Sequence, residues 1–310
     1  MPINIKKVPY FILATLCPLS VFTEETSNNK YRAQDINLKT SLYQNDHLSF
    51  YLEGDVGYRH DSFNNFLELY NDLWDIDGSR QQKADLTQLT FKAGTIIHEY
   101  IFARGSIGYA FLNKDHDTES SYLWGTDYLI NSYEKSFSKG HAYDALIGGG
   151  ARIPLYPDYL ALDAEVGYNY KKIYIKNSLE TKVSSPYVGG TLYGTPGWDV
   201  QFAFYGNYFF LPTLKESGYL YIVNDDSFSP TPTINTNKNV TAYTIGLNVS
   251  YMFFDHMSVN FNWDRFSVSS GYEEGSFAIP VLGSVVTGSY AAKLDYWNSN
   301  QYTFGFRYTF

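Results

Sequence analysis

The chain has 310 residues, of which 30 Tyr, 22 Phe and 5 Trp make 18 % aromatic, and its formal net charge is −9. A mean hydropathy of −0.29 excludes a bundle of membrane helices, because each such helix needs about 20 consecutive apolar residues. The aromatic content excludes a disordered chain, and the acidic balance argues against nucleic-acid binding. Tyrosine in this amount suits a membrane interface, where the ring lies at headgroup level and the hydroxyl stays hydrated.

The N-terminus has the pattern of an export signal. Lys6 and Lys7 precede the apolar stretch 8–21, which is too short to span a membrane as a helix. We therefore predict a signal peptide at 1–23, an N-terminal periplasmic segment at 24–46 and an outer-membrane domain at 47–310. Cleavage would remove Cys17, the single cysteine, and would leave 21 basic and 32 acidic residues, a net charge of −11. Disulfides and thiolate metal sites are thereby excluded.

Alternation of apolar and polar residues predicts ten strands after this segment, an even number as bacterial outer-membrane barrels require. The period of two residues places the two kinds of side chain on opposite faces of each strand. In chain order the predicted strands are 48–60, 86–97, 100–112, 142–154, 162–168, 185–194, 198–211, 243–251, 259–263 and 302–310.

The connections between these strands are alternately short and long. A few residues separate 97 from 100, 154 from 159, 194 from 198 and 254 from 257, whereas longer polar stretches cover 63–85, 113–141, 174–184, 212–238 and 271–295. A membrane barrel has this order because short turns face the periplasm and long loops face outward. The predicted fold class is therefore all-β, a ten-stranded antiparallel transmembrane barrel, in preference to a soluble β-sandwich.

The last strand carries the strongest alternation. Phe306, Tyr308 and Phe310 share its aromatic face, while Gly305, Arg307 and Thr309 form the other face. This ending resembles the C-terminal signal by which outer-membrane proteins reach the barrel-assembly machinery, so we expect these three aromatics to serve as the assembly signal.

In each predicted strand, every second residue faces the lumen and the residues between them face lipid. The charged residues are assigned to the lumen face, because a charge that faces lipid costs about 2–4 kcal/mol for Arg or Lys at the midplane. In one interpretation these charges pair and fill a narrow interior. In the other they line a water-filled path and set its ion preference. The predicted lumen-lining residues are Glu53, Asp55, Arg59, Lys92, Arg104, Asp144, Arg152, Asp163, Glu165, Asp199, Asp264 and Arg307, with Lys171 beside them.

Ten strands and long outer loops resemble the omptins, outer-membrane proteases with a ten-stranded barrel. That resemblance implies an Asp-x-Asp pair after the third strand, which Asp115 and Asp117 match, and an Asp-x-His pair after the seventh. The stretch 212–238 contains Asp225 and Asp226 but no histidine, so no general base near pH 7 is evident. We expect Asp115 and Asp117 to be a residual acidic pair in a solvated loop, and we predict no enzyme activity.

Two segments resemble the Protochlamydia-type outer-membrane proteins of chlamydia-like bacteria. One is Gly-Tyr-Arg-His-Asp-Ser-Phe at 57–63, and the other is Phe-Ala-Arg-Gly-Ser-Ile-Gly-Tyr at 102–109. The final Gly-Tyr pair is inverted relative to the family pattern, and Phe63 stands where that pattern has Trp. The resemblance implies an omptin-like barrel in the outer membrane, porin-like or exposed at the cell surface.

From these patterns we predict passive diffusion of small hydrophilic solutes through a narrow charged lumen. The alternative is a non-conducting surface adhesin or structural barrel that acts through its long loops, and an omptin-like peptidase comes third. The expected partners are outer-membrane lipid, the assembly machinery, and small solutes or a host-surface partner. No cofactor, metal or nucleic acid is expected.

Overall fold

The computed structural model describes residues 48–70, 75–97, 100–123, 129–156, 160–195, 199–221, 228–230, 234–237, 239–254, 256–270, 273–281 and 284–310. The predicted signal peptide at 1–23 and the segment at 24–46 lie outside these residues. Among the described residues, no helix is long and apolar enough to cross a bilayer.

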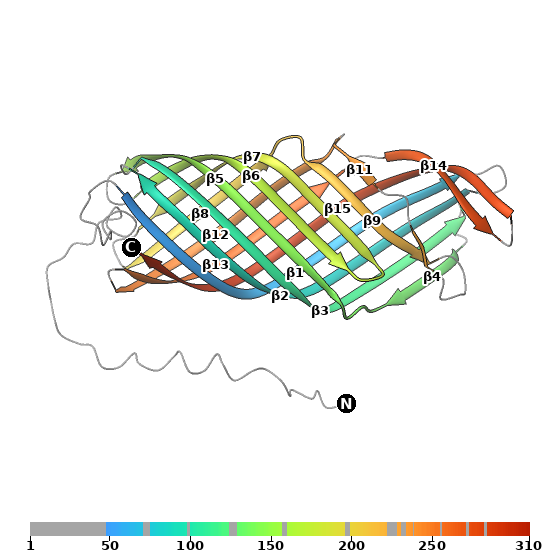
Figure 1. Cartoon of the computed structure of the whole chain (residues 1–310), viewed down its shortest axis with the longest axis horizontal. Coiled ribbons are helices and arrows are strands. Elements are labelled where there is room, and N and C mark those ends of the chain that lie inside the picture. Colours follow the sequence, from blue (N-terminus) through green and yellow to red (C-terminus); the bar gives the residue numbers. More distant parts are fainter. Residues whose placement is uncertain are drawn as a thin grey trace, which may run out of the picture. The chain divides into compact units, whose positions relative to one another are not determined.

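Ten long antiparallel strands close into a barrel (Figure 1). They are β1 (Leu48–Tyr70), β2 (Asp75–Ile97), β3 (Ile101–Leu123), β5 (Gly140–Tyr156), β6 (Leu160–Ile175), β7 (Leu179–Gly194), β8 (Val200–Phe209), β12 (Thr241–Phe254), β13 (Met257–Ser269) and β15 (Ser284–Thr309). Each pairs with its neighbour in the chain, and the ring closes where β1 pairs with β15. All ten predicted strands lie within these elements or overlap them, so the predicted barrel is confirmed.

The strands are longer than the sequence indicated. Most of the predicted loop 63–85 continues β1 and β2 in register up to the pair Tyr70 and Asp75. The other long connections also contain paired strands, namely β4 (Leu129–Lys135), β9 (Thr213–Tyr221), β10 (Phe228–Pro230), β11 (Ile234–Thr236) and β14 (Glu273–Val281). Much of the length that the sequence assigns to long loops is therefore paired strand. Polar residues on both faces resemble a loop in sequence, but backbone pairing with the neighbouring hairpin holds them as strands.

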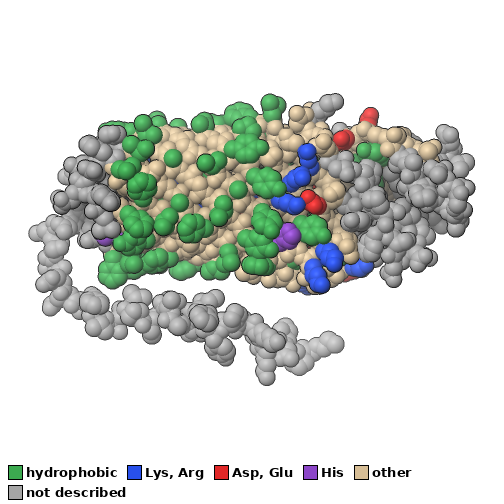
Figure 2. Space-filling view, in the orientation of Figure 1, with side chains coloured by type: hydrophobic (Ala, Val, Ile, Leu, Met, Phe, Trp, Pro, Cys, Tyr) green, Lys and Arg blue, Asp and Glu red, His purple; other side chains and the backbone are tan. Residues whose placement is uncertain are grey.

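Outward-facing aromatics mark one boundary of a lipid-facing belt. We call the exposed residues Tyr58, Phe111, Tyr143, Tyr208, Tyr243 and Tyr302 the upper girdle. Beyond it the next outward residues are polar, for example His60, His141 and Asn300. Figure 2 shows hydrophobic side chains over one part of the barrel surface and charged side chains only beyond that boundary. The short turns and the C-terminus lie at the opposite end of the barrel from β4 and β14 (Figure 1), so the end beyond the girdle is extracellular.

The C-terminal aromatics lie on this lipid-facing surface. Phe306 is 42 % exposed and Phe310 is 37 % exposed, on the outer face of the barrel. The rings of Tyr308 and Phe310 contact each other with centroids 4.8 Å apart. Their predicted part in assembly stays a prediction.

Candidate functional site

The lumen on the periplasmic side holds a network of ion pairs. Lys92 Nζ lies 2.7 Å from Glu53 Oε1 and 2.7 Å from Asp55 Oδ2. Arg307 Nε donates to the other oxygen of Glu53 at 2.7 Å. Because Glu53 and Asp55 are at most 5 % exposed, these bonds supply the partners that a buried carboxylate requires.

A second group of pairs connects β3, β5, β6 and β7. Arg104 Nε donates to Glu165 Oε1 at 2.9 Å, and Tyr187 Oη donates to the same oxygen at 2.7 Å. Arg152 Nε donates to Asp163 Oδ1 at 2.7 Å. Gly148 makes room for this group, since a Cβ there would lie 2.3 Å from Tyr187 Oη.

Arg59 lies deeper in the lumen and is completely buried. Its Nε is 2.9 Å from Asp61 Oδ2, and its Nη1 is 2.9 Å from Asp144 Oδ2. Lys171 Nζ lies 3.4 Å from the second oxygen of Asp144. Asp61 was not among the predicted lumen residues, because the predicted strand ended at residue 60. The odd-numbered residues of β1 face the lumen, and Asp61 is the next of them.

The structure therefore places eleven of the twelve predicted charged residues on the inner face of the barrel. Asp199 is the exception, since it is exposed in the turn that precedes β8. Parity counting misplaced it because the strand begins one residue later, at Val200. Together with Asp61 and Lys171, these eleven residues give seven acidic and six basic side chains on the inner face in this part of the barrel.

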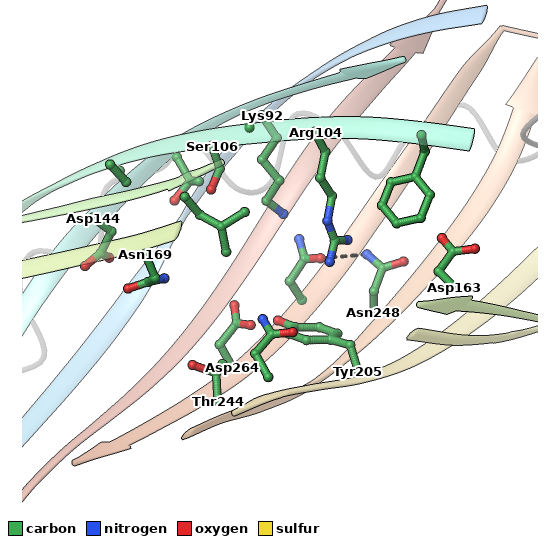
Figure 3. A pocket seen from close by; sticks show the side chains of 18 of the residues that line it. Lys92, Arg104, Ser106, Asp144, Asp163, Asn169, Tyr205, Thr244, Asn248 and Asp264 are labelled. Atoms are coloured by element: carbon green, nitrogen blue, oxygen red, sulfur yellow. Dashed lines mark hydrogen bonds between the residues drawn. The ribbon is translucent and has the colours of Figure 1, made fainter. Parts of the chain in front are cut away.

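A cavity of about 210 Å³ lies among these charges. Lys92 and Arg104 reach into it from one wall, and Asp264 and Thr244 project from the opposite wall (Figure 3). Asn248 donates to Asn262 across this second wall at 2.6 Å. Asp264 makes no ion pair with any described residue, so an acidic side chain without a basic partner lines the cavity.

A layer of buried apolar side chains lies in the lumen beyond the cavity. Each of the ten barrel strands contributes at least one inward side chain that is at most 7 % exposed, and these side chains form one contact cluster. Its members on the ten strands are Phe63, Ala84, Leu86, Ala110, Ala142, Ile173, Ile175, Leu179, Val183, Tyr187, Phe209, Ala242, Phe266, Val268, Ala292, Leu294 and Trp297. We call this set the apolar layer. Sequence analysis missed it, although the inward parity of the strands, continued past the predicted ends, would have found Phe63 and Trp297.

A row of aromatic rings in contact spans the layer from strand to strand. The centroids of Phe63 and Trp297 lie 5.3 Å apart, and those of Trp297 and Phe266 lie 5.2 Å apart. Phe209 continues the row, with its centroid 5.9 Å from Phe266 and 6.0 Å from Tyr187. This row joins β1, β15, β13, β8 and β7 through the interior.

A buried polar cluster lies on the extracellular side of the layer. Gln82 Nε2 donates to both oxygens of Asp115 at 3.0 Å and to Ser178 Oγ at 2.7 Å. Arg80 Nε donates to Asp117 Oδ1 at 2.9 Å. The expectation of a solvated acidic loop was wrong, because Asp115 and Asp117 lie in β3 and are at most 1 % exposed. The pairing of β3 with β2 turns both carboxylates inward.

Glu216 belongs to the same region and was not predicted. It lies on β9, is 7 % exposed, and accepts a hydrogen bond from Thr181 Oγ1 at 3.0 Å. Burial raises the pKa of the Glu216 carboxyl to about 7. Burial also raises the pKa of Asp115 to about 7, and the adjacent Asp117 carboxylate adds to the shift. Among the described residues no group of three or more His, Cys, Asp or Glu could hold a metal ion.

Comparisons with known proteins agree with this architecture. The sequence pattern of the Protochlamydia outer membrane protein family (Pom) matches residues 53–263. No curated protein matches the chain. The outer-membrane protease OmpT of Escherichia coli has a similar structure at 10 % identity, with a TM-score of 0.60 over 84 % of this chain and 97 % of that one. The outer-membrane protein OprG of Pseudomonas aeruginosa, also 10 % identical, covers 84 % of this chain and 95 % of its own at a TM-score of 0.35. At these identities the first likeness supports the fold alone, and the second is too low to support even that.

Proposed function

Since the chain belongs to the Protochlamydia outer membrane protein family and is a β-barrel of the outer membrane, we propose that it is a closed barrel that holds a β-structure at the cell surface. The apolar layer is the observation that carries this proposal. A side-chain layer to which all ten strands contribute leaves little interior for water. This is the surface or structural barrel that the sequence left as the alternative to a diffusion channel.

The strand extensions supply the surface that such a barrel would present. β9, β11, β4 and β14 lie toward the extracellular end, and β14 pairs with β15 over nine residue pairs (Figure 1). Tyr122 on β3 is 38 % exposed in this region, and exposed tyrosines often anchor protein partners. The partner would be a molecule outside the cell.

The first test is the conductance of the refolded full chain in a planar bilayer, after heat-modifiable gel migration has confirmed folding. The wild-type barrel is expected to give no discrete steps. The double variant Phe266→Ala/Trp297→Ala removes two large rings from the layer, so it is expected to give discrete conductance steps. Lys92→Gln, which leaves the layer intact, is the matched control and should stay silent. Regular steps from the wild type would overturn the closed barrel.

Passive diffusion is the second candidate, and the cavity favours it. A space of about 210 Å³ lined by Lys92, Arg104 and Asp264 is the polar interior that a narrow channel needs. If the wild type conducts, neutralising Arg59 or Lys92 should change its ion preference. With seven acidic and six basic lumen charges, that preference should be a weak one for cations.

The proposal includes no peptidase activity. Asp115 and Asp117 are engaged by Gln82 and Arg80, and residues 212–238 contain no histidine that could accept a proton. Incubation of the folded barrel with a basic peptide is expected to leave the peptide intact. Cleavage that disappears in Asp115→Ala would contradict this part of the proposal.

A further inference from the structure

Three lysines lie side by side on the outer surface of the barrel, just beyond the lipid-facing belt. Strand register pairs Lys172 on β6 with Lys182 on β7, and Lys182 with Lys215 on β9. Their flanking neighbours, such as Ile173, Val183 and Leu214, are buried in the lumen, so all three lysines face outward. We call them the lysine row.

The lysine row is a local excess of positive charge in an acidic protein. Like charges on directly opposed strand positions destabilise a sheet. One acid offsets part of this repulsion, because Glu180 Oε1 lies 2.8 Å from Lys172 Nζ. Lys182 and Lys215 make no ion pair with any described residue. The row with Glu180 therefore carries a net charge of about +2 that the described residues do not neutralise.

The lysine row lies at the level of the lipid headgroups, so a headgroup is the anion that would meet it. Below Lys172 the outward residues of β6 include Tyr168, 48 % exposed, and Val166, 63 % exposed, both on the lipid-facing surface. Below Lys215, Leu211 and Tyr208 face the same belt, at 79 % and 53 % exposure. Figure 2 shows Lys and Arg side chains gathered at this boundary, with acidic and histidine side chains among them. Side chains at this level meet lipid headgroups.

The opposite side of the barrel lacks such a row. The outward residues just beyond the belt on β12, β13 and β15 are Thr241, Arg265 and Asn300, which include a single cation. The lysine row therefore has no counterpart on these three strands.

We propose that the lysine row binds the phosphate monoester of a lipid headgroup in the outer leaflet. A phosphate monoester carries about −1.5 to −2 charges near pH 7, which matches the excess of the row. Its oxygens can accept hydrogen bonds from Lys182 and Lys215 while its acyl chains lie against the belt below. This inference does not depend on whether the lumen conducts.

The test compares lipid binding by variants of the full refolded chain. Native mass spectrometry from mixed micelles would measure retention of phosphatidic acid, with phosphatidylcholine as competitor. The triple variant Lys172→Gln/Lys182→Gln/Lys215→Gln is expected to bind phosphatidic acid about thirty-fold more weakly, since Lys182 and Lys215, which have no ion-pair partner among the described residues, each contribute roughly fivefold near an anionic surface. Arg265→Gln, on the opposite side, is the matched control and should bind like the wild type.

A stability measurement gives a second, independent readout. In phosphatidylcholine vesicles the triple variant should be at least as stable as the wild type, because the substitution relieves repulsion within the row. In vesicles that contain phosphatidic acid the wild type should be the more stable of the two, because a bound ligand stabilises the folded state. Equal binding by the triple variant and the wild type, or no reversal of stability order between the two vesicles, would overturn the proposal. Displacement of the lipid by inorganic phosphate at an equal concentration would instead assign the row to free phosphate, and would also overturn it.

Discussion

The outer face of the barrel changes character at the upper girdle, and the apolar layer of the interior lies beyond it. On the periplasmic side the outer face is apolar and the inner face holds Glu53, Lys92 and Arg307 in ion pairs. On the extracellular side the outer face carries charges such as Lys182 and Lys215, while Phe63 and Trp297 pack inside. The same strands run through both parts, so the surroundings of the wall decide the pattern. Lipid excludes charge from the outer face, and water permits it.

Substitution of Arg59 should produce the largest loss of stability, because it disrupts the ion pairs on the inner face of the barrel. Arg59→Met leaves Asp61 and Asp144 buried with one partner fewer, and removal of one member of a buried ion pair costs about 3–5 kcal/mol. Urea unfolding in lipid vesicles would measure the loss. Arg59→Met combined with Asp61→Asn should recover part of it. Full stability in the single variant would contradict the structural role of the network.

An arginine introduced on the lipid-facing surface tests whether lipid excludes charge from the outer face below the girdle. Ile147 faces lipid near the middle of the belt and is 68 % exposed, so Ile147→Arg should cost about 2–4 kcal/mol. The matched substitution beyond the girdle is His116→Arg on the outer face of β3, where the expected change is within about 0.5 kcal/mol. Equal costs at the two positions, measured by the same unfolding experiment, would show that the membrane boundary does not lie at the girdle.

The pH dependence of stability should reveal the buried acids of the extracellular part. The pKa of Glu216 is raised from 4.5 to about 7, so the folded state binds its proton more tightly than the unfolded state does. Stability from this group is therefore fully present below pH 4.5 and is lost as the pH rises through 7. Glu216→Gln should remove this loss and make the protein more stable than the wild type at pH 8, by on the order of 2–3 kcal/mol. Parallel pH profiles for the variant and the wild type would exclude a raised pKa.

The smallest effect is expected at the lone outer cation of β13. Arg265 is exposed and lies just beyond the belt, where a surface substitution usually changes stability by less than about 0.5 kcal/mol. Arg265→Gln should therefore unfold at the wild-type urea concentration. A clear loss would mean that this side of the barrel also depends on a charged contact at the boundary.

Much of the candidate site could be predicted from parity alone. In a strand, Glu53, Asp55 and Arg59 must share one face, and lipid on the other side forces that face inward. Alternation assigned residues to the wrong surroundings near the ends of the predicted strands. Asp199 lies in a turn, and Asp115 lies past a bulge between Asp85 and Leu86 in the β2–β3 pairing, where the simple alternation breaks.

The sequence by itself determined the barrel, because alternation with a period of two and the order of short and long connections are local properties that lipid makes strict. It also determined which charges at membrane depth enter the lumen. Only the tertiary structure decided which of those charges pair, that polar hairpins continue as strands, and that Phe63, Phe209, Phe266 and Trp297 meet in one layer. The contact between Phe63 and Trp297 joins residues more than 200 positions apart, and the alignment of the whole layer depends on strand tilt and register, which no single strand encodes.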